Sequence, residues 1–436
     1  MKWMMMLWLG ITLTAFVYAV DEDELFGDTE TITDSKKIVN NEAMNEGEKK
    51  SLGISGSITS VNTYTLTREW WHTGDDNENS LHSYMSGNLL LDARLKRGIK
   101  GFANLEVEYT PDTGKTQYWL RELFLDFNYK NIVYFRTGKQ VLQWGRCYFF
   151  NPTDLVNVEK KSFIEKVGSR EGAYGVKMHV PFGTKANMYG FIDTGKADNA
   201  DTLAGAYKFE WLMGETEMAL AVWAKKGFHP VYGYDISTRI FKIDVTGEIG
   251  VSYGDNYPFM TEHNGVLYRE KKTDEWVPKV ALGLSKSFDV GDVKDKVSVV
   301  LEGYYNHRGY DENVLEDSSL YFYDEPITID GVVVPAGPKT AYFYGHDLYE
   351  PNNYGKYYLA MFTTVSKFIT SDISLNINGI ANMSDHSAIL STGLSYIDIN
   401  DLSASLTVSG YLGEDDREFT FMGNAMDIRL TVGILF

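Results

Sequence analysis

Histidine, cysteine and serine are the residues with which this chain could build a catalytic or metal site, and it has eight histidines and one cysteine. An acyl-transfer site needs a serine or cysteine beside a histidine that a third group orients. Ser384-Asp385-His386 has that composition, but it lies at a predicted turn, where Asp and Ser are ordinary. The sequence has no H-E-x-x-H motif and no Cys/His pairing. It therefore predicts no catalytic residues, no metal site, no cofactor and no enzyme activity.

Charged and amide side chains are a second group of candidate functional residues. They recur at every second position in several segments. Residues two apart in a strand point to the same face. Such side chains could form a charged constriction that sorts solutes by sign. The alternative, which we favour, is cross-strand ion pairs that only neutralise the wall. Arg121 has the opposite parity and is predicted to face outward near a rim. The recurring residues are Arg94, Lys96, Glu106, Glu122, Asp126, Arg136 and Gln140.

The segments that carry these residues alternate between apolar and polar side chains. Leu89, Leu91 and Ala93 alternate with polar residues, and the last segment, 426–436, has an apolar residue at every second position and ends on Phe436. A Lys or Arg facing lipid at mid-bilayer costs about 2–4 kcal/mol, so the polar faces must line a lumen. The pattern predicts an all-β fold, a transmembrane antiparallel up-and-down β-barrel. A final strand that ends on an aromatic residue also resembles the assembly signal of bacterial outer-membrane barrels.

Eighteen strands follow from the alternation, and losing one hairpin would leave sixteen. An even number places both ends of the barrel sequence at the same end of the barrel. The predicted strands are 51–67, 83–97, 99–110, 117–130, 132–144, 173–182, 185–195, 203–213, 216–226, 231–241, 243–254, 277–290, 296–308, 355–370, 372–384, 387–399, 401–412 and 426–436.

Short and long connections between these strands alternate, as they must if one barrel end is periplasmic. The long connections are 68–82, 145–172, 255–276 and 309–354, and Asp330-Gly331 in the last of them predicts an extracellular hairpin. The predicted tight turns are Arg97-Gly98, Lys130-Asn131, 182–184, 213–215, Lys242-Ile243, Thr370-Ser371 and Asn400, with a looser turn at 291–295.

The first fifty residues divide into two parts. Lys2, the apolar run 3–16 and Ala19 predict a signal peptide, residues 1–19, although an uncleaved anchor helix is the alternative. Residues 20–50 are acidic and lack periodicity, which predicts a disordered periplasmic lead-in. The barrel then occupies residues 51–436. The formal charge of −19 argues against nucleic acid as a partner, and the single Cys147 allows no internal disulfide.

The most distinctive local sequence runs from Tyr118 to Asn157. It contains Gly138-Lys139-Gln140, then Trp144-Gly145, then Asn151-Pro152-Thr153-Asp154. These motifs resemble a porin-like family of bacterial outer-membrane barrels of unknown function, in which a G-K/R-Q strand leads through W-G into an N-P-x-D loop. The resemblance covers about forty residues specifically and implies an outer-membrane location and a channel-like form.

The loop that follows this motif is the predicted constriction. Asn151-Pro152-Thr153-Asp154 is a turn and helix-start signal, and one or two short helices could follow over 155–167. Porin loops at this early position often fold inward, so we expect residues 146–172 to enter the barrel; a surface loop is the alternative. Arg146, Lys161 and Arg170 are then expected to face the pathway. The expected anchors of the loop are Trp144, Asn151, Asp154 and Asn157.

Together these features predict an outer-membrane porin-like channel for the passive passage of small hydrophilic solutes. Membrane lipids, lipopolysaccharide and small-molecule solutes are the expected partners. The alternative is a non-transport barrel that acts as a surface adhesin or assembly component through its long extracellular loops. A transporter of hydrophobic solutes fits less well, because the inward faces are polar. The sequence leaves open the solute, the direction of transport, whether the lumen is open or plugged, and whether the protein is a homo-oligomer.

Overall fold

A computed structural model of the chain describes residues 51–68, 79–95, 98–157, 172–195, 197–329, 331–397 and 401–436. The signal peptide and the acidic lead-in expected over 1–50 lie outside these residues and remain predictions. Among the described residues, no helix is long and apolar enough to cross a membrane.

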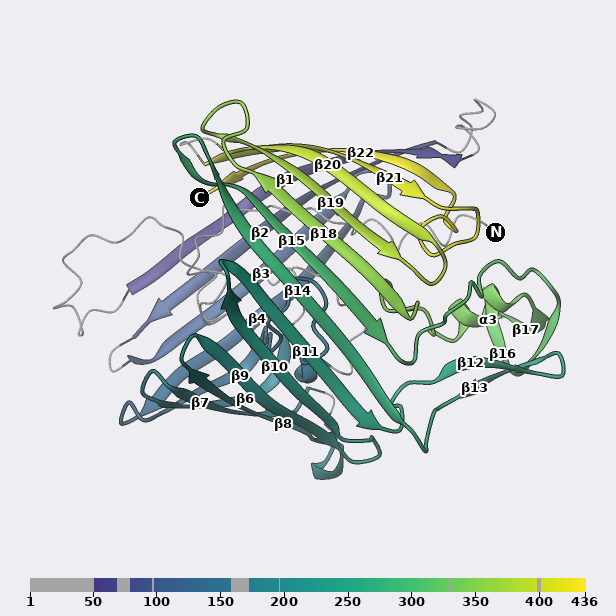
Figure 1. Cartoon of the computed structure of the whole chain (residues 1–436), viewed down its shortest axis with the longest axis horizontal. Coiled ribbons are helices and arrows are strands. Elements are labelled where there is room, and N and C mark those ends of the chain that lie inside the picture. Colours follow the sequence, from purple (N-terminus) through teal and green to yellow (C-terminus); the bar gives the residue numbers. More distant parts are fainter. Residues whose placement is uncertain are drawn as a thin grey trace.

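Eighteen strands form one antiparallel sheet in which each strand pairs with its neighbours along the chain (Figure 1). The sheet closes where the first strand pairs with the last, with Ser57 opposite Leu435. The predicted barrel with eighteen strands is confirmed. The strands are β1 Ser51–Thr67, β2 Ser80–Arg94, β3 Lys100–Thr110, β4 Lys115–Tyr129, β5 Val133–Gln140, β6 Ala173–Phe182, β7 Ala186–Asp193, β8 Ala204–Met213, β9 Thr216–Lys225, β10 Val231–Ile240, β11 Ile243–Tyr253, β14 Trp276–Val290, β15 Val293–Asn306, β18 Tyr357–Val365, β19 Ile373–Asn382, β20 Ser387–Ile397, β21 Leu402–Leu412 and β22 Asn424–Leu435.

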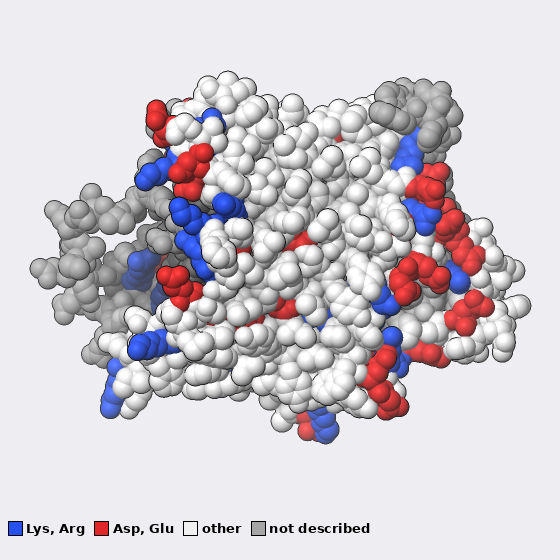
Figure 2. Space-filling model, in the orientation of Figure 1, with Lys and Arg blue, Asp and Glu red and all other residues white. Residues whose placement is uncertain are grey.

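Alternation of side chains between the two faces of each strand gives the barrel an apolar outer surface. In β4, Leu123 and Leu125 are 51% and 52% exposed, whereas Phe124 between them is 5% exposed. Figure 2 shows the charged side chains gathered near the two ends of the barrel, with a band of uncharged residues between them. Such a band matches the hydrocarbon layer of a membrane, because charges are costly there.

One end of the barrel, here called the turn end, has short connections. Lys130 and Asn131 between β4 and β5, and Phe241 and Lys242 between β10 and β11, all have positive φ, as two-residue hairpin turns require. The turn after β10 was predicted one residue too late, at Lys242-Ile243. The tight turn predicted at Thr370-Ser371 was also wrong. β18 ends at Val365, and the longer connection 366–372 leads to β19.

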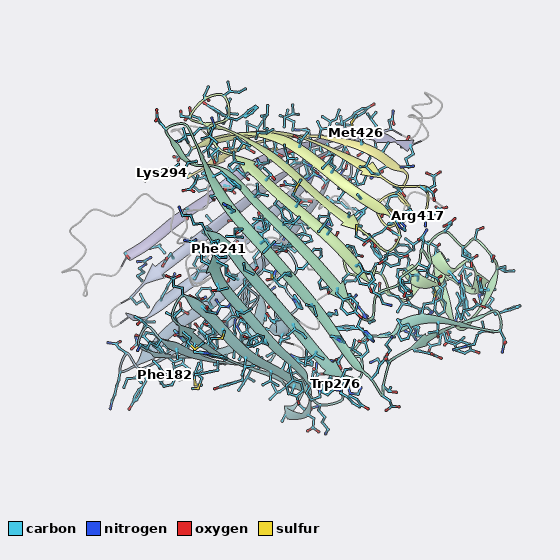
Figure 3. The ribbon with its side chains drawn as sticks, viewed as in Figure 1. Phe182, Phe241, Trp276, Lys294, Arg417 and Met426 are labelled. Atoms are coloured by element: carbon cyan, nitrogen blue, oxygen red, sulfur yellow. The ribbon has the colours of Figure 1, made fainter. Side chains whose placement is uncertain are left out.

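The opposite end, here called the loop end, has the long connections. Trp276 and Arg417 lie toward it, and Phe182, Phe241 and Lys294 toward the turn end (Figure 3). Exposed tyrosine and tryptophan side chains encircle the loop end, and mostly phenylalanine encircles the turn end. Tyr and Trp favour the boundary between lipid and water. The first group is Tyr64, Tyr109, Tyr118, Tyr174, Tyr207, Tyr232, Tyr253, Trp276 and Tyr357, and the second is Phe127, Tyr129, Tyr134, Phe182, Phe241, Phe288, Phe368 and Phe436.

Two of the long connections fold together into a loop-end subdomain beside the barrel mouth (Figure 1). It consists of β12 Phe259–His263, β13 Val266–Glu270, β16 Tyr321–Ile329, β17 Val332–Gly337 and α3 Lys339–Gly345, with the four strands in one sheet. Its core includes Leu267, Tyr342 and Phe343, each fully buried. The hairpin predicted in this connection is confirmed, with Thr328 opposite Val333. The strands β12 and β13 were missed, because five-residue segments carry too little periodicity to be recognised.

Candidate functional site

Residues 141–157, here called the crossing segment, lie inside the barrel. The predicted strand 132–144 ends early, at Gln140, because the chain turns into the lumen there. Leu142, Trp144 and Leu155 pack on the inner faces of β7, β8 and β9. Phe149 and Phe150 pack on β14, β15 and β18 to β21. The crossing segment therefore connects two sides of the lumen wall, and the inward-folding loop expected from the sequence is present in the part that the structure describes.

Glu248 of β11 binds the backbone of the crossing segment at two places. One carboxylate oxygen accepts hydrogen bonds from the backbone N–H groups of Arg146 at 2.5 Å and Cys147 at 2.6 Å. The other accepts from the Thr153 N–H at 3.0 Å and the Thr153 hydroxyl at 2.7 Å. Glu248 is 3% exposed. A buried carboxylate is tolerated only when its lone pairs are satisfied, and these four donors satisfy them.

Glu302 of β15 makes the equivalent contact on the other side of the lumen. Its carboxylate accepts from the backbone N–H of Tyr148, of Phe149 at 2.9 Å and of Phe150 at 3.0 Å. The residue is 1% exposed. Three consecutive N–H groups converge on one carboxylate, and this fixes the backbone of the segment at these three residues. Two glutamates of the wall thus hold the middle of the crossing segment.

The entry into the segment is held by one acidic and one basic side chain of the wall. Glu122 of β4 accepts from the Val141 N–H at 2.9 Å, and the ammonium of Lys208 in β8 donates to the Trp144 carbonyl at 2.5 Å. Lys208 also lies 2.9 Å from Glu210 and 3.2 Å from Asp235. Side chains of the wall therefore satisfy two backbone polar groups at the start of the segment, the Val141 N–H and the Trp144 carbonyl.

Arg146 is surrounded by carboxylates. Its guanidinium contacts Asp235 of β10 and Glu217 of β9, and lies 3.4 Å from Glu210 of β8. Its side chain is 15% exposed. Together with Lys208 this cluster has two cations and three carboxylates, and all five groups are ion-paired. Arg146, which the sequence placed facing the pathway, belongs to this paired network.

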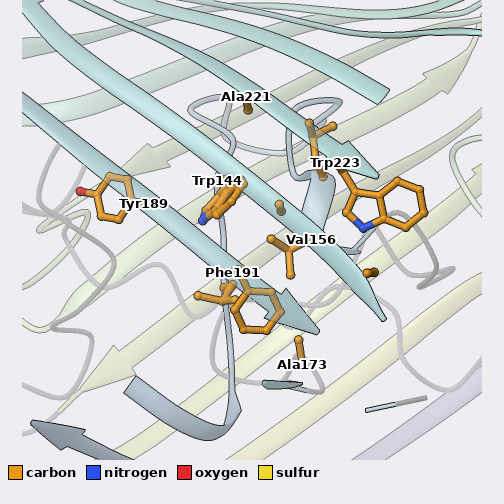
Figure 4. Packing of buried hydrophobic residues seen from close by; sticks show 11 residues of the cluster. Trp144, Val156, Ala173, Tyr189, Phe191, Ala221 and Trp223 are labelled. Carbon is orange, nitrogen blue, oxygen red and sulfur yellow. The ribbon is translucent and has the colours of Figure 1, made fainter. Parts of the chain in front are cut away.

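Aromatic packing fills the space around these polar contacts. The ring of Phe150 stacks on Tyr304 of β15, with 4.6 Å between their centroids. Figure 4 shows Trp144 and Val156 of the crossing segment among Tyr189, Phe191, Ala221 and Trp223 of β7 and β9. Each aromatic side chain buries about 150–250 Å² of surface away from water. This packing therefore stabilises the position of the crossing segment in addition to the hydrogen bonds.

Glycine makes room for the segment at two positions. A Cβ at Gly250 of β11 would lie 2.3 Å from the Pro152 carbonyl oxygen, and a Cβ at Gly145 would lie 2.2 Å from the Asn151 amide oxygen. Both distances are too short for any side chain. Gly250 therefore lets Pro152 approach the barrel wall, and Gly145 lets the segment fold back on itself.

The expected anchors Trp144 and Asn151 are buried, at 6% and 2% exposed. The Asn151 side chain donates to the Phe149 carbonyl at 3.2 Å, and the Asp154 N–H donates to the Asn151 carbonyl, so the predicted turn forms. Of the short helices expected over 155–167, the described residues show a 3-10 helix at Leu155–Asn157. The side chain of Asn157, and Lys96, Lys161 and Arg170, lie outside the described residues, so their expected roles remain predictions.

Asp126 and Arg136 are direct neighbours on β4 and β5 and form a two-pronged ion pair, at 2.7 and 2.8 Å. This is the cross-strand pairing that we favoured over a free charged constriction. Arg94 lies at the turn end, 3.4 Å from Asp92. Gln140 is fully buried at the end of β5 and is therefore not an open pore-lining group.

The outward placement of Arg121 was wrong. A β-bulge in β4 shifts the register between Asn104 and Leu105 of β3, so that Leu105 pairs with Leu120 and Asn104 with Glu122. The extra residue turns Arg121 to the inside, where it lies 2.7 Å from Glu106. Bulges change the side-chain parity on one side of the extra residue, which simple alternation cannot anticipate.

Glu248, Glu302, Asp235 and Lys208 were not among the residues selected from the sequence. Each sits at an inward position of its strand, and a carboxylate or ammonium in an otherwise alternating strand is a usable signal. Strand parity alone does not reveal that these side chains contact residues 141–157.

Ser384-Asp385-His386 does not form a catalytic arrangement. The Ser384 hydroxyl accepts from the backbone N–H groups of Lys356 and Tyr357. Asp385 accepts from Ser387 and from the Glu418 N–H. These are the contacts of a turn that holds two loops. Among the described residues, His, Cys, Asp and Glu form no group that could hold a metal ion.

The closed eighteen-strand barrel with an inward-folded segment defines a porin-type fold. No protein-family model matches the sequence, and no curated protein sequence is similar to it. Solved structures of bacterial outer-membrane porins, which are channels, share the fold. OccK2 (OpdF) of Pseudomonas aeruginosa has a TM-score of 0.52 and 8% identity over 88% of this chain and 98% of that chain. OccAB3 of Acinetobacter baumannii has a TM-score of 0.51 and 8% identity over 88% and 99%. OpdL of Pseudomonas aeruginosa has a TM-score of 0.50 and 7% identity over 88% and 99%.

Proposed function

We propose that this protein is a bacterial outer-membrane channel through which small hydrophilic solutes diffuse passively, without a catalytic step. The observation that carries the proposal is a barrel whose outer surface is an apolar band between two aromatic belts, while its inner surface carries hydrogen-bonding and ion-paired groups. A wall of this kind is stable only with lipid outside and water inside.

The crossing segment is proposed as the constriction of the channel, together with residues 158–172 that continue the loop. It occupies part of the lumen and is held by Glu248 and Glu302, so it keeps its place while solutes pass. The inward charges Glu106, Asp126 and Arg136 line the wall as ion pairs. Loss of one partner from either pair is proposed to create a net charge that changes ion preference.

Single-channel recording in planar bilayers tests this function. The mature protein should give steps of current, and deletion of residues 146–172 should raise the size of each step, because the lumen widens. A deletion of similar length in the loop-end subdomain, residues 313–339, is the matched control and should leave the step size unchanged. The absence of current from correctly folded protein would overturn the channel; an unchanged step after deletion of 146–172 would overturn only the constriction.

A surface-binding barrel is the second candidate, and the loop-end subdomain favours it. This subdomain has its own sheet and its own aromatic core, beyond what is needed to connect strands. A binding role requires that cells lose attachment to a surface when residues 313–339 are removed. Loss of attachment by this variant, combined with an absence of current from the intact protein, would support the adhesin and exclude the channel.

A further inference from the structure

The lumen wall has one side without charge. The sequences of β18, β19, β20 and β21 contain no Lys, Arg, Asp or Glu. Figure 1 shows these four strands side by side. Toward the turn end their inward side chains are amides and hydroxyls, which include Thr364, Asn376, Ser391, Ser395 and Ser403. The strands from β3 to β11 differ, because charged residues occupy their inward positions.

Many of the charges on that other side are paired, and the remainder is carboxylate, because Glu122 and Glu248 accept hydrogen bonds from backbone N–H groups. Asp126 pairs with Arg136, Glu106 with Arg121, and Lys208 with Asp235. Because opposite charges that lie within 4 Å leave only a weak field at a distance, these pairs attract neither sign strongly, and the remaining carboxylates do not attract anions. The uncharged side then has more influence on which solutes bind.

Hydrogen-bonding groups on the uncharged side are only partly satisfied. The Thr364 hydroxyl donates to the side-chain amide oxygen of Asn376 at 3.0 Å, and the Asn376 side-chain NH₂ donates to the Ser395 hydroxyl at 3.1 Å. Among the described residues, the Asn378 amide oxygen and the Thr431 hydroxyl of the adjacent β22 have no hydrogen-bond partner, although the two residues are only 7% and 1% exposed. A buried polar atom without a partner costs free energy, and a solute hydroxyl could satisfy it.

An aromatic surface lies beside these groups. Tyr148 of the crossing segment is 43% exposed, and its ring lies 4.8 Å from that of Phe362 in β18. Phe362 is the direct cross-strand neighbour of Asn378. An aromatic ring next to amide and hydroxyl groups matches a pyranose, which has an apolar face of C–H groups and an edge of hydroxyls.

We propose that Tyr148, Asn378 and the surrounding amide and hydroxyl side chains form a binding site for neutral, hydroxyl-rich solutes such as monosaccharides. The inference rests on the proposed channel function and names its solute class. Anionic sugars are disfavoured, because β18 to β21 offer no cation to offset the loss of their hydration, and Arg429 of the adjacent β22 is buried and donates to the Thr63 hydroxyl. The solute binds between the crossing segment and the turn end, where the apolar contacts of the segment give way to polar side chains.

Block of the ion current by added sugar tests the site, with glucose and glucuronate as probes of similar size. Glucose should reduce the current in a saturable manner, and glucuronate should do so only at a several-fold higher concentration. Asn378→Leu should raise the half-saturating glucose concentration about fivefold, the effect of one lost hydrogen bond. Tyr148→Ala should have a similar effect. Asn187→Leu, an inward amide of β7, is the matched control and should leave glucose block unchanged.

The outcomes separate the two proposals. A current without saturable glucose block, or with equal block by glucuronate, would overturn the sugar site and leave the channel intact. No current from folded protein would overturn both. If Asn378→Leu fails to fold, Asn378→Ala removes the amide oxygen without adding an apolar side chain of similar size and should still weaken glucose block. Unchanged block by this variant would also overturn the site.

Discussion

At the scale of single residues, the structure depends on carboxylates that point inward from the barrel wall. Glu122, Glu248 and Glu302 lie on three different strands, and all accept hydrogen bonds from the crossing segment. Backbone N–H groups inside a lumen need an acceptor, and an ionised carboxylate is a strong one. These residues connect the chemistry of the wall to the position of the loop.

Replacing Glu248 with Gln should loosen the crossing segment. The amide retains one acceptor oxygen and presents an NH₂ group to donors that need an acceptor, so at least one N–H loses its partner. The expected cost is about 1–3 kcal/mol in the free energy of unfolding, with larger fluctuations of the single-channel current. Denaturant unfolding in detergent and planar-bilayer recording measure the two effects. Glu215→Gln, at an exposed turn, is the control; equal behaviour of the two variants would contradict the role of Glu248.

Glu418, in the connection between β21 and β22, predicts a pH dependence at the loop end. Its carboxyl accepts from the Asn352 N–H, the Tyr358 hydroxyl and the Asn382 amide, each at 2.8 Å. Burial, and next the charge of Asp385, raise the pKa of Glu418 from 4.5 to about 8. A raised pKa in the folded state means that its stabilising contribution is complete below pH 4.5 and is lost as the pH rises through 8.

The contacts of Glu418 should therefore open more often as the pH rises between 5 and 8, by up to about tenfold per pH unit. Hydrogen exchange at the Asn352 N–H measures this opening, after correction for the intrinsic exchange rate. Glu418→Gln removes the titrating group and should flatten the dependence. A steep dependence that persists in the Gln variant would assign it to another group.

At the scale of elements, strand parity, a bulge in β4 and a glycine in β11 determine where the inward side chains and the crossing segment lie. The bulge in β4 brings Arg121 to the inside beside Glu106, where it forms an ion pair instead of facing lipid. Gly250 leaves space for Pro152 between two inward residues of β11. The crossing segment thus requires specific features of the wall as well as its own sequence.

Gly250→Val should displace the crossing segment without deleting it. The new Cβ would lie 2.3 Å from the Pro152 carbonyl oxygen, a distance that neither group can accept. Single-channel conductance should rise toward that of the variant lacking residues 146–172, and stability should fall by about 1–3 kcal/mol. Gly205→Val in β8, where a Cβ meets nothing within 4 Å, is the control. Conductance equal to that of the unchanged protein would show that the segment tolerates the contact.

At the scale of the whole molecule, the barrel separates two solvents. Outward side chains form the apolar band and the two aromatic belts, while inward side chains hydrogen-bond with one another and with the crossing segment. A closed barrel satisfies every strand edge, which a membrane requires. The loop-end subdomain adds a second core outside this band.

Adjacent positions on β21 give a direct test of this arrangement. Leu406 faces outward at mid-strand and is 47% exposed, and Ser405 faces the lumen. Leu406→Arg should lower the free energy of unfolding in lipid vesicles by about 2–4 kcal/mol. Ser405→Arg should cost much less and should instead change the ion preference of the channel. The opposite order of stabilities would reverse the assignment of the two faces.

The sequence by itself determined the barrel and which residues of most strands face inward, and it predicted eighteen strands while leaving sixteen as the alternative. It could do so because a strand between lipid and water repeats every two residues, and that signal is local. The same local signal placed Asp126 and Arg136 on inward faces of neighbouring strands. The inward loop was predicted from its position early in the barrel, because porin loops at this position often fold inward.

Only the tertiary structure decided how the loop is held. Glu248 and Glu302 lie far along the chain from residues 146–153, and their contacts exist only because the closed barrel brings β11 and β15 beside the crossing segment. The bulge at Arg121 and the short strands β12 and β13 were also decided there. For the two glutamates the cause is a contact between distant segments, and alternation within one strand contains no information about such a contact. The bulge interrupts the alternation between two adjacent strands, and β12 and β13 are too short for alternation to be recognised.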